Sequence, residues 1–85
     1  YSIEQNYPNP FNPSTVIRYD VPLNGRVTLK VYDMLGREVT TLVDGELEAG
    51  HQSVEWNASG IASGVYFYRM TAGTFSETKR LMLMK

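Results

Sequence analysis

The sequence predicts an all-β protein, an antiparallel sandwich or barrel. Apolar and polar residues alternate with the period of two that places successive side chains on opposite faces of a strand. Turn-forming residues interrupt the alternation at the spacing of roughly 8–12 residues that is typical of such folds. Helical periodicity is nearly absent. The chain has 85 residues, one histidine and no cysteine, so one modest core must stabilise a single small domain without disulfides.

The first two strands are predicted at residues 15–21 and 26–32, where β-branched and aromatic residues alternate with polar ones. Between them lie Asn24 and Gly25, a strong signal for a type I′ hairpin turn, in which both central residues take positive φ. These two strands are therefore expected to pair directly. A turn that ends at Gly36, a residue free to take positive φ, follows the second strand.

The middle of the chain predicts two more strands. Residues 38–43 form the first, which Asp44 and Gly45 are expected to end because both are turn formers. A polar connection over residues 46–50 leads to the next strand at residues 51–56.

The C-terminal part carries the most aromatic strand, predicted at residues 65–71. Ala72 and Gly73 predict a tight hairpin to the last strand, residues 75–84. A short seventh strand is expected either near residues 2–6 or around Ile61, and Ile61 is also expected to plug the loop in which it lies.

The N-terminal stretch NYPNPFNPST contains Pro8, Pro10 and Pro13. Each proline lacks a backbone donor, fixes φ and disfavours the α region for the residue before it, so the segment is predicted to be extended and semi-rigid. It is excluded from a central strand. We interpret residues 1–13 as a Pro-rich linker or hinge from an upstream domain, and residues 14–85 as the folded β-sandwich. Phe11 and Tyr7 are expected to plug the end of the sandwich.

Composition excludes several classes of function. The formal net charge of −1 opposes binding to nucleic acid or to an anionic membrane surface. No apolar run reaches the roughly 18 residues of a membrane span, and the first residues do not form an export signal. His51 has no cysteine to activate, and the alternating Asp44, Glu46 and Glu48 lack the spacing of a calcium loop. We therefore predict no catalytic residue, no cofactor and no metal site.

Four motifs in a fixed order identify a family resemblance. They are NYPNPFNPST, LKVYDMLGREV, SGVYFYRM and the terminal KRLMLMK. Together they resemble the type A C-terminal sorting domain of the type IX (Por) secretion system, over about residues 6–85. They are also similar to the immunoglobulin-like domain of flagellar hook-capping proteins. The resemblance implies an immunoglobulin-like antiparallel β-sandwich of six to seven strands.

The resemblance also implies a function. Such a domain stands at the C-terminus of a cargo protein that reaches the periplasm by a separate signal. Outer-membrane type IX translocon components recognise it, and a sortase-like peptidase at the cell surface typically removes it and can attach the cargo to lipopolysaccharide. The cargo is then at the cell surface or extracellular. We expect no enzymatic activity in the domain itself and no direct membrane insertion.

The resemblance assigns residues to two roles. The first set is expected to be mainly structural: Tyr32, Asp33, Leu35, Gly36, Arg37, Gly64, Tyr66 and Tyr68. Within it, Gly36 and Gly64 are expected where a side chain would clash. The second set is the hypothetical translocon-recognition site: Lys79, Arg80, Leu81, Leu83 and Lys85. An edge strand at this position would bind a partner by strand addition. The alternative is that its basic residues only protect an exposed edge from aggregation.

Two other functions stay open. A carbohydrate-binding module of a secreted enzyme would present an aromatic platform built from Trp56, Tyr66 and Tyr68, although lining the core is the interpretation that we favour for these rings. A passive structural spacer would be indifferent to its terminal residues.

Overall fold

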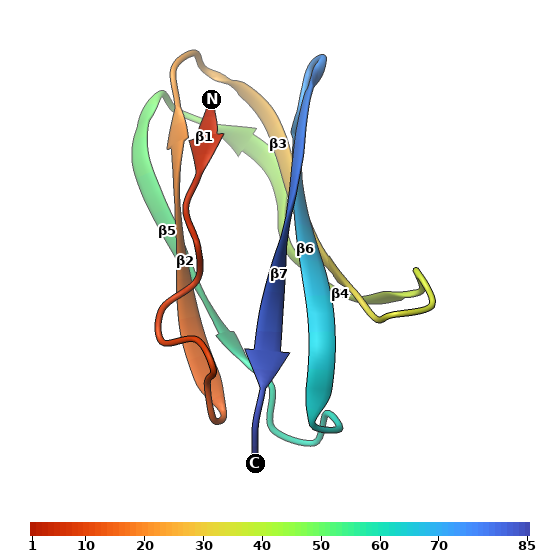
Figure 1. Ribbon diagram of the computed structural model, residues 1–85. Coiled ribbons are helices and arrows are strands. Elements are labelled where there is room, and N and C mark those ends of the chain that lie inside the picture. The colour runs from red at the N-terminus through yellow and green to blue at the C-terminus, as the bar shows by residue number, and fades with distance from the viewer.

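The computed structural model describes all 85 residues and confirms the all-β prediction, with seven strands and no helix (Figure 1). The strands are β1 (Ser2–Ile3), β2 (Ser14–Val21), β3 (Gly25–Tyr32), β4 (Glu38–Leu47), β5 (Gly50–Asn57), β6 (Gly64–Ala72) and β7 (Phe75–Leu83). The structure thus contains no helix of the length and hydropathy needed to cross a membrane.

The strands form two facing sheets. The three-stranded sheet has the order β1-β2-β5 and the four-stranded sheet the order β4-β3-β6-β7, with every pair antiparallel. Pairing of the second strand with the fifth, and of the third with the sixth, is the arrangement of immunoglobulin-like sandwiches. The two termini lie at opposite ends of the sandwich (Figure 1).

The core fills the space between the sheets. Ile17, Leu29, Tyr68 and Leu81 are each completely buried, as the period-two pattern of their strands predicts. Trp56 and Tyr66 pack edge to face, with ring centroids 6.0 Å apart. The aromatic residues that a sugar platform would need therefore line the core, which confirms the favoured interpretation.

The end of the sandwich is closed by one of the two expected aromatic residues. Phe11 is buried and its ring lies 5.6 Å from that of Trp56, so its predicted role as a plug is confirmed. Tyr7 is 72% exposed, so that part of the prediction was wrong. Ile61 packs against the core as expected, and the short seventh strand lies at Ser2–Ile3.

The predicted hairpin at Asn24 and Gly25 is wrong. β2 and β3 lie in different sheets, and neither Asn24 nor Gly25 has the positive φ that a type I′ turn requires. The connection instead crosses from one sheet to the other, held by a 2.8 Å hydrogen bond from the Ala49 amide to the Asn24 side-chain oxygen. A local turn signal cannot distinguish these two outcomes, because pairing depends on contacts made elsewhere in the chain.

The predicted end of β4 at Asp44 and Gly45 is also wrong. The strand continues to Leu47, with Asp44 and Gly45 paired to Thr28 and Val27 of β3. Two register shifts in this ladder add residues on the β4 side, and they break the simple alternation that the sequence pattern assumes.

Residues 1–13 pack on the sandwich. β1 pairs with β2, and Ile3, Asn6 and Phe11 are all buried. The segment is therefore in contact with the folded domain along much of its length. That it also connects to an upstream domain stays a prediction.

Candidate functional site

β7 is an edge strand of the four-stranded sheet, as a strand that binds partners by addition has to be. Its side chains alternate strictly between the core and the solvent. Leu81 and Leu83 point inward with no exposed surface, whereas Arg80 and Met82 point outward. Within the hypothetical recognition site, a partner of the folded domain therefore cannot contact the two leucines.

Lys79 shares the inward side with the leucines but is only partly buried. Its ammonium group pairs with the Glu77 carboxylate at 3.3 Å, and its side chain is 28% exposed. Lys85 is exposed beyond the end of the strand, where its amide donates to the Ser63 hydroxyl at 3.1 Å. Arg80 and Lys85 are thus the exposed members of the set.

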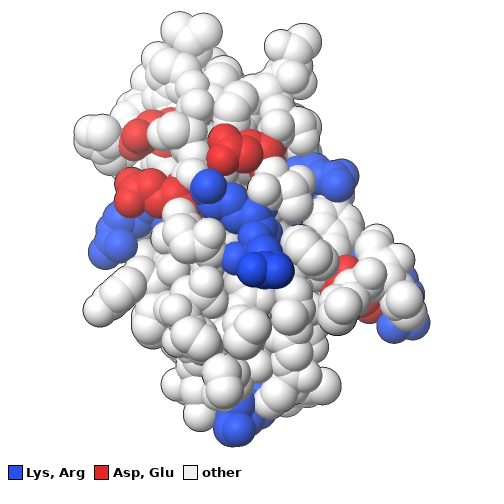
Figure 2. All heavy atoms as spheres, in the orientation of Figure 1, with Lys and Arg blue, Asp and Glu red and all other residues white.

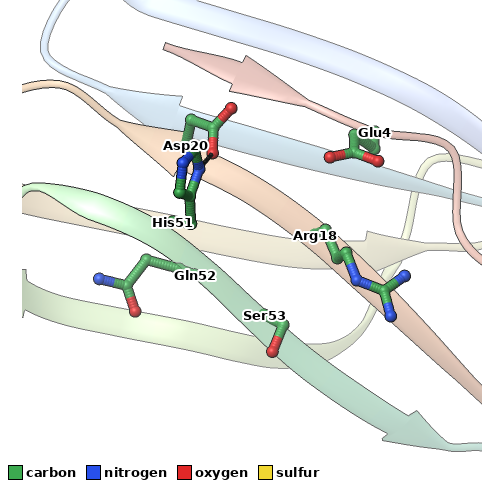
Figure 3. Close-up of a pocket in the computed structure, with 6 residues that line it drawn as sticks. All are labelled: Glu4, Arg18, Asp20, His51, Gln52 and Ser53. Carbon is green, nitrogen blue, oxygen red and sulfur yellow. Dashed lines mark hydrogen bonds and ion pairs between the residues drawn. The ribbon is translucent and has the colours of Figure 1, made fainter.

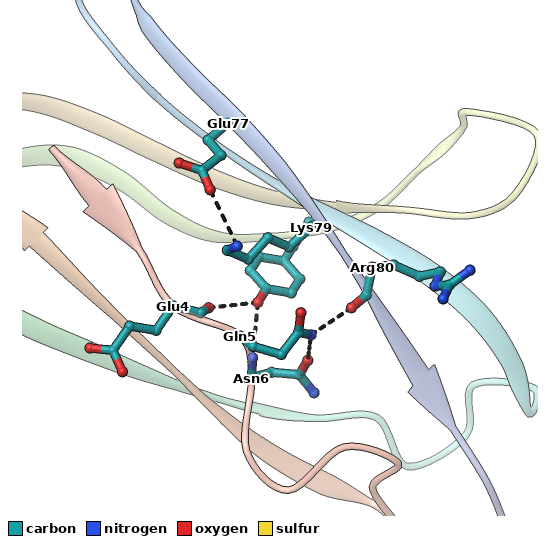
Figure 4. A network of polar contacts seen from close by, with 7 residues as sticks. Glu4, Gln5, Asn6, Glu77, Lys79 and Arg80 are labelled. Atoms are coloured by element: carbon teal, nitrogen blue, oxygen red, sulfur yellow. Dashed lines mark hydrogen bonds and ion pairs between the residues drawn. The ribbon is translucent and has the colours of Figure 1, made fainter.

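The N-terminal segment runs alongside the free edge of β7. Phe11 donates its amide to the Met82 carbonyl and accepts the Met84 amide, both at 3.0 Å. The Asn9 side-chain oxygen accepts the Met82 amide at 3.0 Å, and Gln5 donates to the Arg80 carbonyl at 2.7 Å (Figure 4). The backbone groups that an added strand would use near the end of β7 are therefore already hydrogen-bonded within the chain.

Tyr68 fastens this segment to the core. Its hydroxyl donates to the Glu4 carbonyl at 2.7 Å and accepts the Asn6 amide at 2.9 Å (Figure 4). Burial raises the pKa of Tyr68 to about 12, because the phenolate would lose its hydration. The hydroxyl therefore stays protonated, as its bond to the Glu4 carbonyl requires.

Asn6 is the buried polar centre of the segment. Its side-chain amide donates to the Thr15 hydroxyl at 3.0 Å, and that hydroxyl donates to the Pro8 carbonyl at 2.9 Å. The prolines predicted that this stretch is rigid, but the hydrogen bonds that Asn6 and Asn9 make were not predicted. The sequence did offer one signal for these bonds, because asparagine recurs at every third position of NYPNPFNPST.

The motif turn after β3 is organised by Asp33. Its carboxylate accepts the amides of Leu35 and Arg37 at 2.9 and 3.0 Å, and it also pairs with the Arg37 guanidinium at 2.9 Å. The hydrogen bond from the Arg37 amide is the main cause that lowers the pKa of Asp33 below its usual value. Leu35 is left 77% exposed and neighbouring Met34 71% exposed at the tip of the turn.

The clash expected at Gly36 and Gly64 was wrong, whereas the positive φ expected at Gly36 is confirmed. No atom lies within 4 Å of the position that a Cβ would occupy at either residue, so no clash excludes a side chain. Gly36 instead has a φ of +83°, a conformation that other residues adopt only with strain.

Tyr66 and Tyr32 complete the positions of the motif residues. The Tyr66 hydroxyl donates to the Ala62 carbonyl four residues earlier, at 2.5 Å, which is the contact of a tyrosine corner in immunoglobulin-like sandwiches. Tyr32 lies on the outer face of the four-stranded sheet, beneath the guanidinium of Arg69 at 5.2 Å from the ring centroid.

A separate polar hollow of about 260 Å³ lies on the outer face of the three-stranded sheet (Figure 3). His51 contacts Asp20 there, and this hydrogen bond raises the pKa of His51 and lowers that of Asp20. The His51 side chain is 96% exposed, as expected for a solvated histidine. No hydrogen bond joins His51 to Ser53 in this hollow.

Metal-binding side chains do not gather anywhere in the structure. No group of three or more His, Cys, Asp or Glu residues is placed to hold an ion. Asp44, the first residue of the acidic alternation, pairs with Arg26 across the β3 and β4 ladder.

The fold and these contacts define a small immunoglobulin-like module whose two terminal segments are joined along one edge. A family model described as "Secretion system C-terminal sorting domain" matches residues 5–84. The chain therefore belongs to this family, the C-terminal sorting domains of type IX secretion. Membership implies an upstream cargo, the type IX machinery and secretion to the cell surface or the extracellular space, and the family is not a catalytic one. No curated protein and no solved structure matches the chain.

Proposed function

We propose that this domain is a non-catalytic sorting signal that directs a periplasmic cargo protein through the outer membrane by being bound by translocon components of the type IX system. The cargo precedes residue 1 in the same chain. A sortase-like peptidase acts on the chain after translocation, and the cargo ends at the cell surface or in the medium. The family match over residues 5–84 carries this proposal.

The structure supports recognition at β7 and the residues that follow it. Arg80 and Lys85 are exposed on the strand and beyond its end. Leu81 and Leu83 contribute by holding the strand on the core, since both are fully buried. Lys79 contributes charge, because its side chain is partly exposed.

Export of a reporter tests the proposal. A fluorescent protein with a periplasmic signal at its N-terminus and residues 1–85 at its C-terminus is expressed in a bacterium with an intact type IX apparatus and in a translocon-null strain. We expect the reporter outside the cell only when the apparatus is present. Release in both strains, or retention in both, would contradict the proposal.

The matched control replaces residues 1–85 by an unrelated immunoglobulin-like sandwich. It separates recognition of this domain from passive leakage of any small folded tail. A spacer predicts that the two tails behave alike. Removal of Leu81 to Lys85 is a poor test, because both buried leucines would be lost and the domain would unfold.

A further inference from the structure

The accessible part of β7 belongs to a larger surface on the outer face of the four-stranded sheet. In the antiparallel register, Tyr32 lies opposite Phe67 and Phe67 opposite Arg80, while Val65 lies opposite Met82. Residues opposite one another share a face and touch. We call the resulting surface the outer patch, and it consists of Tyr32, Val65, Phe67, Arg69, Arg80 and Met82.

The outer patch combines apolar area with room for a side chain. Met82 is 37% exposed, and the rings of Tyr32 and Phe67 are half-buried. An open hollow of about 230 Å³ lies beside Phe67 and Arg69 and is bounded by Met34 of the Asp33 turn. Methionine adapts to differently shaped partners, and exposed apolar surface of this kind marks interaction sites.

The charge of the outer patch is positive and uncompensated. Arg69 and Arg80 take part in no ion pair. The nearby carboxylates already form ion pairs with other residues, Asp33 with Arg37 and Glu38 with Lys30. Figure 2, which looks onto the edge that β7 forms, shows basic side chains near the middle of the molecule with acidic ones beside them, above a largely uncharged lower half.

We propose that the outer patch is the surface that a protein partner of the sorting machinery binds, through a segment that carries carboxylates on either side of an apolar side chain. The carboxylates pair with Arg69 and Arg80, whose guanidinium groups match them in geometry. The apolar side chain enters the hollow beside Phe67. This inference rests on the proposed function and adds the surface and the chemistry of the partner.

Other occupants fit the outer patch less well. A second copy of the chain, bound through the same patch about a two-fold axis, would bring Arg69 and Arg80 against their own counterparts. An anionic bilayer would meet a domain whose formal net charge is −1. Strand addition at the end of β7 would first have to displace the hydrogen bonds of Asn9 and Phe11.

Charge reversal tests the surface in the reporter assay. The double substitution Arg69→Glu and Arg80→Glu is expected to lower apparatus-dependent export about ten-fold or more, because two attractive pairs become repulsive. The pair Arg69→Lys and Arg80→Lys, which keeps the charge, is expected to retain most export. Arg18→Glu is the matched control, since Arg18 is exposed on the outer face of the other sheet. Circular dichroism and thermal unfolding confirm that each variant folds.

The outcomes separate the inference from the proposed function. If the unmodified domain is exported by the apparatus and the double Glu variant is exported equally well, the outer patch is not the binding surface and the proposed function stands. If the unmodified domain is not exported, the proposed function fails.

A binding measurement decides the outer patch independently of export. The isolated domain, labelled with ¹⁵N, is titrated with a synthetic peptide of alternating glutamate and leucine and, separately, with phosphatidylglycerol vesicles. We expect the peptide to shift the amide signals of Phe67, Arg80 and Met82, in a manner that salt weakens, and the vesicles to leave them unchanged. Shifts only with vesicles, shifts centred on Arg18 and His51, or no shift would each overturn the inference.

Discussion

The outer faces of the two sheets differ, although their inner faces are alike. Both inner faces bury apolar side chains in one shared core. The outer face of the three-stranded sheet is polar, with Arg18, Asp20, His51 and Ser53 around its hollow. The outer face of the four-stranded sheet carries the outer patch, in which aromatic and aliphatic side chains surround two unpaired arginines.

Folding requires that both sheets have an apolar inner face, but it does not require that their outer faces differ. An antiparallel sheet needs one covered face, and its other face is free to be polar. The three-stranded sheet shows that this sequence can provide such a face. Apolar side chains retained on the solvent side of the four-stranded sheet therefore call for another cause, and a binding partner is the cause that we propose.

The largest expected effect separates the inner and outer sides of β7. Leu81→Ala is expected to lower the free energy of unfolding by about 2–5 kcal/mol, because it removes a fully buried side chain and leaves a cavity. Met82→Ala, one residue further along, is expected to change it by less than about 1 kcal/mol. Urea denaturation followed by circular dichroism measures both.

The effect on export is expected to have the opposite order. Among variants that remain folded, the substitution of Met82 is expected to lower export more than the substitution of Leu81. Equal losses of stability at the two positions would show that the alternation of β7 does not separate a structural side from a binding side.

The period of two made the strand faces predictable. Which residues of β6 and β7 point inward depends only on local geometry, so the buried Tyr68 and the exposed Arg80 follow from the sequence pattern. The pairing of the strands could not be predicted from the sequence pattern, because it depends on contacts between residues that are distant in sequence. The Asn24 and Gly25 signal was the strongest in the sequence and still failed, since β2 finds its partner in β5.

Tyr68→Phe gives the next largest expected effect, and it tests how firmly the N-terminal segment is held. The substitution leaves the buried Asn6 amide without its acceptor, which is expected to cost about 1–3 kcal/mol of stability. Faster hydrogen exchange at the Asn6 amide is expected at the same time. Tyr7→Phe is the matched control, because Tyr7 is 72% exposed and should change stability little.

The raised pKa of Tyr68 gives this region a distinct pH dependence. Its folded value of about 12 lies above the ordinary value of 10.0, so the stabilisation is complete below pH 10.0 and is lost as the pH rises through about 12. Absorbance of the phenolate measures the titration. If Tyr68, identified as the component missing in Tyr68→Phe, titrated near pH 10.0, the hydroxyl would not be buried against Glu4 and Asn6.

The candidate site was less predictable than the fold. Five residues were singled out together: Lys79, Arg80, Leu81, Leu83 and Lys85. The structure divides them among buried, partly buried and exposed positions. Asn9 was missed because its partner, Met82, lies 73 positions away in sequence. The alternation of β6 places Val65 and Phe67 on the other face from Tyr66 and Tyr68, but only the assembled sheet places them beside Arg80 and Met82.

The smallest expected effect concerns the polar face. The contact with Asp20 raises the pKa of His51 above 6.5 and lowers that of Asp20 below 3.8. The pair therefore stabilises the fold fully between these two values, and less as the pH falls through the lowered pKa of Asp20 or rises through the raised pKa of His51.

Asp20→Asn is expected to return the pKa of His51 toward 6.5 in an NMR titration, with little change in stability at neutral pH because both groups are exposed and screened by salt. The same variant is expected to leave export unchanged. Loss of export from Asp20→Asn, with the outer-patch variants exported normally, would reverse the comparison and place the binding surface on the three-stranded sheet.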